Sequence, residues 1–195
     1  MQRLDGKRIA VLVTDGFEEV ELTDPMRALK EAGARAEIVS PSGGGSNGKV
    51  KASRHDQPGQ EFDVDTPLER ADPRSYDALL LPGGVRNPDA LRMNEKAVQF
   101  VRSFFDESKP VAAICHGPWM VVEAGAAKGR NMTSWPSLKT DIQNAGGTWT
   151  DEPVVVDVGL VTSRKPADLP QFNEKMCQEF ARAVHAPQVL AGAGD

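Results

Sequence analysis

The sequence predicts an α/β fold, a three-layer sandwich in which a mostly parallel sheet is covered by helices on both faces. Short apolar segments alternate along the chain with longer segments whose apolar residues recur at helical spacing. Several of the short segments are apolar at every position, which is typical of strands buried on both faces of a parallel sheet. The segments with helical spacing are therefore expected to form the two outer layers.

The individual elements follow in chain order. We expect strands at residues 8–13, 36–39, 78–81, 111–114, 154–156 and 160–162, with the last two paired across a turn. We expect helices at residues 18–32, 94–108, 119–124, 137–145 and 169–184, and Asp168 is the candidate N-cap of the last one. The Gly- and Ser-rich stretch 41–48 is predicted to be a loop. The polar stretch 49–65 is predicted to be a hairpin or an excursion of unassigned purpose.

Length and composition describe an ordinary globular chain. Its 195 residues fit a single domain, with a core expected over residues 7–184 and a flexible tail at 185–195. The formal net charge is −5 and no run of Lys or Arg occurs, which argues against a nucleic-acid surface. The sequence begins without an apolar signal core, and no stretch approaches the roughly 18 apolar residues that cross a membrane. We therefore expect a cytoplasmic protein with no membrane partner.

The cysteines and histidines are too few for a disulfide framework or a metal site. Two cysteines and three scattered histidines lack ligand spacing, and no glycine-rich loop matches a phosphate or dinucleotide fingerprint. We expect no metal and no cofactor. Cys177 lies beside the apolar stripe of the last predicted helix, so we expect it to pack in the core. His55 and His185 are expected to be solvated.

The segment VAAICHGPWMVVEAG places one nucleophile, Cys115, between a buried strand and a helix. This order is typical of a nucleophile elbow, a strained turn that lifts a side chain over the sheet edge. The start of the helix offers free N–H groups and a positive partial charge, which favour a thiolate. His116 brings an imidazole to the same edge, although adjacent residues of an extended chain point to opposite sides. The alternative is a packed cysteine with an incidental histidine.

Two other strand ends carry unusual residues. The strand at 78–81 leads into Gly83 and Gly84, whose exposed N–H groups could form an oxyanion hole with the amide of His116, unless the segment is a plain turn. The first strand leads into a helix start with Glu18, Glu19 and Glu21. One of these carboxyls could hydrogen-bond the Cys115 sulfur, and the pattern alone does not select which. Because ligands of open α/β sheets bind at the carboxyl ends of strands, we expect these segments to converge on one cleft.

Four motifs together, DGFEEVEL, YDALLLPGG, PVAAICHGP and VTSRKPADLP, resemble the PfpI family of the ThiJ/PfpI superfamily over residues 7–184. The resemblance implies a class I glutamine amidotransferase-like (flavodoxin-like) fold. It places the family's nucleophile on Cys115 and the neighbouring histidine on His116. It further places the acid that contacts the nucleophile on Glu18, which could donate a hydrogen bond when protonated, and the oxyanion-hole glycines on Gly83 and Gly84.

The resemblance also implies self-association. In PfpI-like proteases a glutamate from a neighbouring subunit completes a Cys–His–Glu triad, and the matching position here is Asp89. Aspartate is one methylene shorter than glutamate, so a triad would be absent or loosely formed. The partner expected from the family is another copy of the chain, in a homodimer or hexamer in which Asp89 completes a neighbour's site.

The implied function is nucleophilic attack of the Cys115 thiolate on a carbonyl in a stress-response enzyme. The substrate would be a peptide or a small carbonyl compound, so the enzyme would be a peptidase or a deglycase/glyoxalase-like hydrolase. His116 would move protons in either case. A redox-sensing or chaperone-like stress protein, in which Cys115 is reversibly oxidised without turnover, is the alternative hypothesis.

Overall fold

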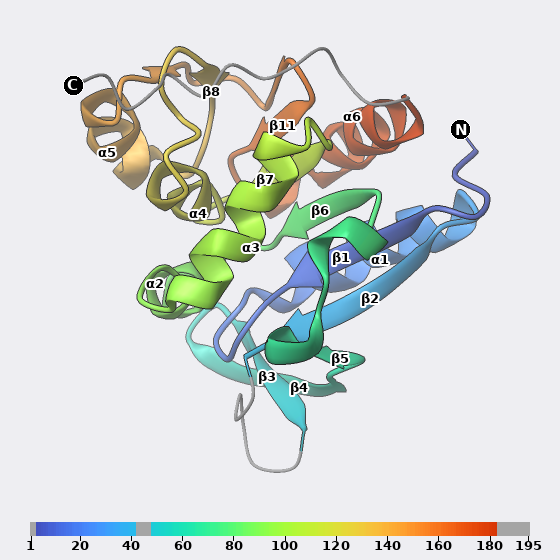
Figure 1. Cartoon of the computed structure of the whole chain (residues 1–195). Helices are drawn as coiled ribbons and strands as arrows, with labels where there is room; N and C mark the ends of the chain where they lie inside the picture. The colour runs from blue at the N-terminus through green and yellow to red at the C-terminus, as the bar shows by residue number, and fades with distance from the viewer. Residues whose placement is uncertain (1–2, 42–47, 183–195) are drawn as a thin grey trace.

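The computed structural model describes residues 3–41 and 48–182 (Figure 1). Its centre is a seven-stranded sheet in the order β10-β11-β7-β6-β1-β2-β5, in which every neighbouring pair is parallel except β10 and β11. The strands are β1 (Arg8–Leu12), β2 (Arg35–Ser40), β5 (Thr66–Pro67), β6 (Ala78–Leu81), β7 (Val111–Ile114), β10 (Val154–Asp157) and β11 (Leu160–Ser163). The predicted α/β architecture and the mostly parallel sheet are confirmed.

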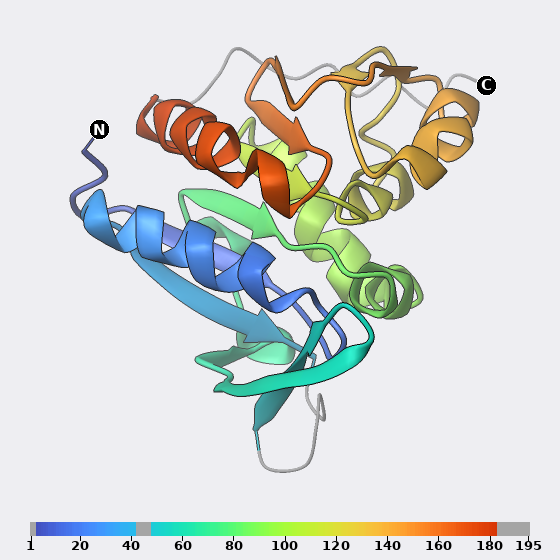
Figure 2. The same cartoon turned by 180° about the vertical axis from the view of Figure 1, so that it is seen from behind.

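Helices cover both faces of the sheet, as Figures 1 and 2 show. One face carries α1 (Glu19–Glu31) and α6 (Leu169–Ala181). The other carries α2 (Arg86–Arg92), α3 (Glu95–Asp106), α4 (Pro118–Glu123) and α5 (Lys139–Asn144). Short 3₁₀ turns occupy Leu68–Arg70, Pro73–Ser75, Pro136–Leu138 and Pro166–Asp168. Strands β6 and β7 are buried at every residue, in agreement with their continuous apolar sequences.

The polar stretch 49–65 contains the predicted hairpin, formed by β3 (Lys49–Arg54) and β4 (Gln57–Asp63). The hairpin is tied to the segment that follows β1. The Lys51 N–H donates to the Asp15 carboxylate at 2.7 Å, and the Gly16 N–H donates to the Lys51 carbonyl at 2.8 Å. It therefore stands beside the carboxyl edge of the sheet as a separate wall. A second small sheet pairs β8 (Asn131–Met132) with β9 (Thr148–Trp149).

Three local features differ from the sequence predictions. Helix α2 has no counterpart among the predicted elements, because it has seven residues and carries Pro88 in its first turn. Asp168 does not cap α6 with its side chain, since its carboxylate accepts a hydrogen bond from Arg164 Nε at 2.9 Å. The helix predicted at 137–145 begins at Lys139, after a 3₁₀ turn.

Some predictions fall on residues outside the described ranges. These are most of the loop at 41–48, the tail at 185–195 and His185. Across residues 3–41 and 48–182, none of the helices has both the length and the apolarity needed to span a bilayer.

Candidate active site

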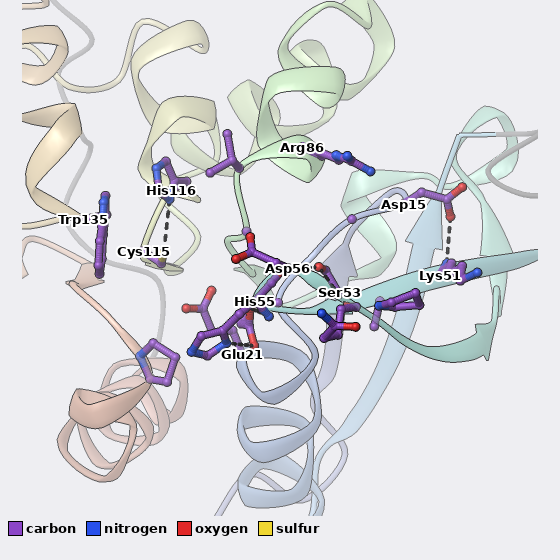
Figure 3. Close-up of a pocket in the computed structure, with 18 residues that line it drawn as sticks. Asp15, Glu21, Lys51, Ser53, His55, Asp56, Arg86, Cys115, His116 and Trp135 are labelled. Atoms are coloured by element: carbon purple, nitrogen blue, oxygen red, sulfur yellow. Dashed lines mark hydrogen bonds and ion pairs between the residues drawn. The ribbon is translucent and has the colours of Figure 1, made fainter.

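The carboxyl ends of β1, β6 and β7 open into one pocket with a volume of about 800 Å³ (Figure 3). The three strands are neighbours in the sheet, so the segments that follow them meet as predicted. Asn87 joins two of these ends: its side chain accepts from the Thr14 N–H at 2.8 Å and donates to the Pro82 carbonyl at 2.9 Å. The pocket is lined by Asp15, Gly16, Glu18, Glu21, Lys51, Ala52, Ser53, His55, Asp56, Gln57, Pro58, Gly84, Val85, Arg86, Cys115, His116, Trp135 and Pro166.

Cys115 occupies a strained turn between β7 and α4. Its φ is +61°, in the left-handed region that non-glycine residues rarely adopt. The turn is held by the Cys115 N–H, which donates to the Ser163 carbonyl at 3.0 Å. A Cβ on Gly117 would lie 2.4 Å from the Leu81 carbonyl oxygen, so this position requires glycine. The elbow predicted from VAAICHGP is therefore present, with the side chain of Cys115 directed to the pocket.

The imidazole of His116 contacts the nucleophile. Its Nδ1 lies 3.2 Å from the Cys115 Sγ, and its Nε2 lies 3.3 Å from the Ser137 Oγ. The positive φ at Cys115 explains how adjacent residues meet, because the backbone there is not extended. The rings of Trp119 and Trp135 pack against the imidazole, with centroids at 5.2 and 6.1 Å. Burial lowers the pKa of His116 below its ordinary value, so the ring is neutral at pH 7.

The carboxyl beside Cys115 belongs to Glu21, whereas the resemblance had pointed to Glu18. The Glu21 Oε2 accepts the Gly83 N–H at 2.9 Å, and the carboxyl interacts with Cys115. Its Oε1 is buried and has no other hydrogen-bond partner among the described residues. Burial raises the pKa of Glu21 to about 8. At neutral pH the side chain therefore carries a proton that it can donate to the sulfur.

Glu18 lies in the same pocket but binds the hairpin. It precedes α1 with an extended backbone, and its Oε2 accepts the His55 N–H at 3.0 Å. Its Oε1 lies 3.4 Å from the Nδ1 of His55, whose side chain is 84% exposed. Glu21 is one helical turn further along, and that turn places its side chain over the sheet edge. The solvated character predicted for His55 is confirmed, but its place in the pocket wall was not anticipated.

The charge state of the Cys115 sulfur depends on its neighbours. Burial raises the pKa of the thiol, and a negative charge on Glu21 raises it further, whereas the N–H groups of Gly84 and His116 lower it. The prediction of a helix terminus that favours a thiolate is therefore not met in the resting site, since α4 has only six residues and the sulfur is buried. Glu21 and Cys115 act as a coupled pair that holds at most one negative charge near pH 7.

The backbone donors at the sulfur are the N–H groups of Gly84 and His116. Gly83 and Gly84 were both predicted as oxyanion-hole residues, but the Gly83 N–H is already bound to Glu21. A Cβ on Gly83 would lie 2.6 Å from the Glu21 Oε2 and 2.7 Å from the Cys115 Cβ. Gly83 therefore allows the acid and the nucleophile to approach each other. Gly84, at φ +73°, directs the available N–H toward the sulfur.

Asp89 does not contact His116 of its own chain. It lies in the first turn of α2, and its carboxylate pairs with Arg92 at 2.8 Å. The Arg92 guanidinium in turn lies 4.6 Å from the centroid of the Trp119 ring. The side chain of Asp89 is 56% exposed, so it remains available to a second molecule. Participation of Asp89 in a neighbour's site stays a prediction.

Over the described ranges, no three His, Cys, Asp or Glu side chains are clustered closely enough to hold an ion. The two free cysteines, Cys115 and Cys177, lie in different parts of the fold.

A strained cysteine at the carboxyl edge of a flavodoxin-like sheet, with a histidine and a buried acid in contact, defines a class of α/β proteins with a nucleophilic cysteine. The chain belongs to the DJ-1/PfpI family, whose model matches residues 7–179. It is 44% identical to "Deglycase PfpI" of Pyrococcus furiosus over 83% of this chain and 92% of the relative. It is 41% identical to "General stress protein 18" of Bacillus subtilis, over 87% and 95%. The structure of Drosophila melanogaster DJ-1beta superposes with a TM-score of 0.80 at 30% identity, over 93% and 91%.

Proposed function

We propose that the protein is a cysteine-dependent deglycase that acts on small adducts formed between 2-oxoaldehydes and amines or thiols. The contact between the Cys115 Sγ and the His116 Nδ1, at 3.2 Å and beside the N–H groups of Gly84 and His116, carries this proposal. It supplies a nucleophile, a base and an oxyanion site in one pocket. The name of the P. furiosus relative, a deglycase, supports the choice of substrate class.

The first step joins the adduct to the sulfur. The neutral His116 accepts the thiol proton at Nδ1 as the Cys115 Sγ bonds to the carbinol carbon and the bond from that carbon to the amine breaks. The amine leaves with the proton from His116. The product is a hemithioacetal whose oxygen accepts hydrogen bonds from the N–H groups of Gly84 and His116.

The second step releases a 2-hydroxy acid. The proton on the hemithioacetal carbon moves to the neighbouring carbonyl carbon, and the hydroxyl proton moves to the carbonyl oxygen. These two transfers convert the hemithioacetal to a thioester without an external oxidant. Water then attacks the thioester, the carbon–sulfur bond breaks, and a proton returns to Cys115. When the sulfur carries negative charge, the protonated carboxyl of Glu21 stabilises it by donating a hydrogen bond.

The shape of the pocket favours a small substrate over a folded peptide chain. Cys115 is 8% exposed and lines a cavity of about 800 Å³. The β3–β4 hairpin forms one wall and Trp135 lies on another (Figure 3). A peptidase would use the same sulfur and base, and it is the second candidate. Burial, which raises the thiol pKa, disfavours a sensor that relies on a freely exposed thiolate.

The test compares freshly reduced wild type with Cys115→Ala. The substrates are N-acetylcysteine and N-acetyllysine that have been treated with methylglyoxal, and a fluorogenic peptide is assayed in parallel. We expect the wild type to release lactate and the free amine or thiol, and the variant to match the spontaneous rate. Cys177→Ala is the matched control, because it removes the other thiol. Peptide cleavage without lactate would replace the deglycase by the peptidase, and absence of both activities would refute the proposal.

We further propose that the protein assembles with copies of itself, in keeping with its family, and that it works in the cytoplasm. The exposed Asp89 is the residue through which a neighbour could contribute to the site. Size-exclusion chromatography with light scattering, across a dilution series, measures the assembly directly.

A further inference from the structure

The second ring nitrogen of His116 has a partner within the same chain. The Ser137 Oγ lies 3.3 Å from the His116 Nε2, on the side of the ring opposite the Cys115 sulfur. Ser137 belongs to the 3₁₀ turn Pro136–Leu138, which precedes α5. That turn is attached to the elbow itself, since the Trp135 N–H donates to the Cys115 carbonyl at 2.9 Å. The hydroxyl and the nucleophile are therefore held in a fixed relation.

The two contacts of the ring determine where its proton must lie. Burial keeps His116 neutral at pH 7, so one nitrogen carries a hydrogen and the other accepts. To take the proton of Cys115, Nδ1 must be the accepting nitrogen. Nε2 then carries the hydrogen and donates it to the Ser137 hydroxyl. The same donation persists after Nδ1 is protonated, so Ser137 supports both states of the base.

We propose that Ser137 is a positioning residue for His116, which holds the ring with an unprotonated Nδ1 facing Cys115 and thereby completes the nucleophile's relay within a single chain. This proposal rests on the proposed function, because it assigns His116 the part of the base. The resemblance had given the corresponding place to an acid from a neighbouring subunit. In the part of the chain that the structure describes, the polar side-chain atoms in contact with this ring are those of Cys115 and Ser137.

The surroundings of the ring agree with a neutral partner. Trp119 and Trp135 pack against the imidazole with their rings. The charged groups of Arg92 and Asp141 contact the ring of Trp119. A carboxylate at Nε2 would raise the pKa of the imidazole, whereas a hydroxyl orients the ring without doing so. The low pKa of His116 therefore suits a base that is neutral, oriented and ready to accept a proton near pH 7.

The consequence is that activity should not require assembly. A neighbour's Asp89 could bind the His116 Nε2 only by displacing the Ser137 hydroxyl or sharing the same hydrogen. In its own chain Asp89 is paired with Arg92. We therefore expect kcat per chain to be unchanged on dilution.

The experiment uses full-length Ser137→Ala and Ser137→Thr, with Ser103→Ala as the matched control. Ser103 lies on the exposed side of α3, and its hydroxyl donates to its own helix. In Ser137→Ala we expect kcat to fall by roughly tenfold with KM within about twofold, and Ser137→Thr to restore most of it. Equal thermal melting of the variants shows that the fold is intact.

Two further readouts do not depend on turnover. The first is the rate of Cys115 alkylation by iodoacetamide against pH, measured in a Cys177→Ala background. We expect Ser137→Ala to slow it near neutral pH and to move the inflection that His116 contributes. The second is the pair of ¹⁵N chemical shifts of the Nδ1 and Nε2 atoms of His116, measured by NMR. These shifts should show one tautomer in wild type and a mixture of both in Ser137→Ala.

These readouts separate the two proposals. If wild type shows no deglycase turnover, the proposed function fails, while the tautomer and alkylation profiles still test Ser137. An unchanged tautomer, alkylation profile and kcat in Ser137→Ala would overturn the positioning role. So would a large loss in Asp89→Asn that depends on protein concentration, because a neighbour's acid would then be the group that orients His116.

Discussion

The two cysteines are both buried, yet their surroundings are opposite in kind. Cys115 is 8% exposed and sits at a turn with φ +61°, in contact with the His116 ring and the Glu21 carboxyl. Cys177 is 2% exposed and lies within α6, packed among apolar side chains that face the sheet. Burial alone therefore does not distinguish a reactive thiol from a structural one. The distinction comes from the backbone turn and the polar partners that it brings to the sulfur.

The pKa of each thiol makes the same point. Burial raises the pKa of both cysteines above its ordinary value. At Cys115 the N–H groups of Gly84 and His116 oppose that rise, and His116 can accept the proton. In the described part of the chain Cys177 makes no side-chain hydrogen bond, and burial is the main influence on its pKa. Cys115 can therefore be activated during a reaction, whereas Cys177 cannot.

The largest expected effect is the difference between the two alanine variants. We expect Cys115→Ala to lower kcat by about 1000-fold or more, because it removes the nucleophile itself. Cys177→Ala should retain kcat within about twofold and lose about 1 kcal/mol of stability from the buried cavity. Deglycase kinetics measure the change in kcat, and denaturant unfolding measures the change in stability. A similar loss of activity in both variants would mean that the comparison of the two thiols is wrong.

Thiol labelling gives the second comparison. In folded protein, iodoacetamide should modify Cys115 and leave Cys177 unmodified, since the latter is exposed only on unfolding of α6. Mass spectrometry should therefore find one label under native conditions and two in guanidinium. The Cys115→Ala variant is the control and should take no label while folded. Rapid native labelling of Cys177 would contradict its assignment as a core residue.

The third prediction concerns the carboxyl that distinguishes the site of Cys115. Because burial raises the pKa of Glu21 to about 8, activity should fall as pH rises through that value and the carboxylate repels the thiolate. Glu21→Gln keeps an oxygen for the Gly83 N–H and an N–H for the sulfur, so its alkaline fall should disappear. A pH profile of kcat/KM measures this. An alkaline limb that persists in Glu21→Gln would assign that titration to another group.

The same residue predicts how stability depends on pH. The pKa of Glu21 is raised in the folded state from its ordinary value of 4.5 to about 8. Its contribution is therefore fully present below pH 4.5 and is lost as pH rises toward 8. Relative to wild type, Glu21→Gln should gain stability progressively across that interval and show no further gain above it. Thermal melts at matched pH values provide the measurement, and a constant difference would contradict the assignment.

The parts of the fold that follow from local pattern were predictable from the sequence. The fully apolar segments at β6 and β7 match the structure residue for residue, since burial on both faces leaves little freedom of pattern. The elbow at Cys115 was predictable because CHGP directly follows such a strand. The need for glycine at Gly117 depends on the carbonyl of Leu81, 36 positions earlier in the sequence, and only the three-dimensional structure brings them together.

The parts of the site that depend on rotation about a helix, or on distant segments, were not predictable in the same way. Glu18 and Glu21 differ by one helical turn, and the motif did not indicate which carboxyl would cover the sheet edge. Ser137 lies at the start of a segment that was predicted to be a helix, and nothing in that pattern marks it as a partner of His116. His55 reaches the pocket because the β3–β4 hairpin is bonded to the residues after β1, a pairing that no local pattern encodes.

The smallest expected effect comes from Glu18, the acid that the resemblance selected. Glu18→Gln keeps an oxygen for the His55 N–H and changes only the contact with the His55 imidazole, whose side chain is 84% exposed. Exposed contacts of this kind contribute little to folding stability. We therefore expect kcat within about threefold of wild type and a stability change below about 0.5 kcal/mol. Steady-state kinetics of Glu18→Gln and Glu21→Gln, side by side at pH 7 and pH 9, measure the contrast. If Glu18→Gln loses activity and the alkaline limb while Glu21→Gln retains both, then Glu18 is the acid that governs the sulfur, as the resemblance alone would have it.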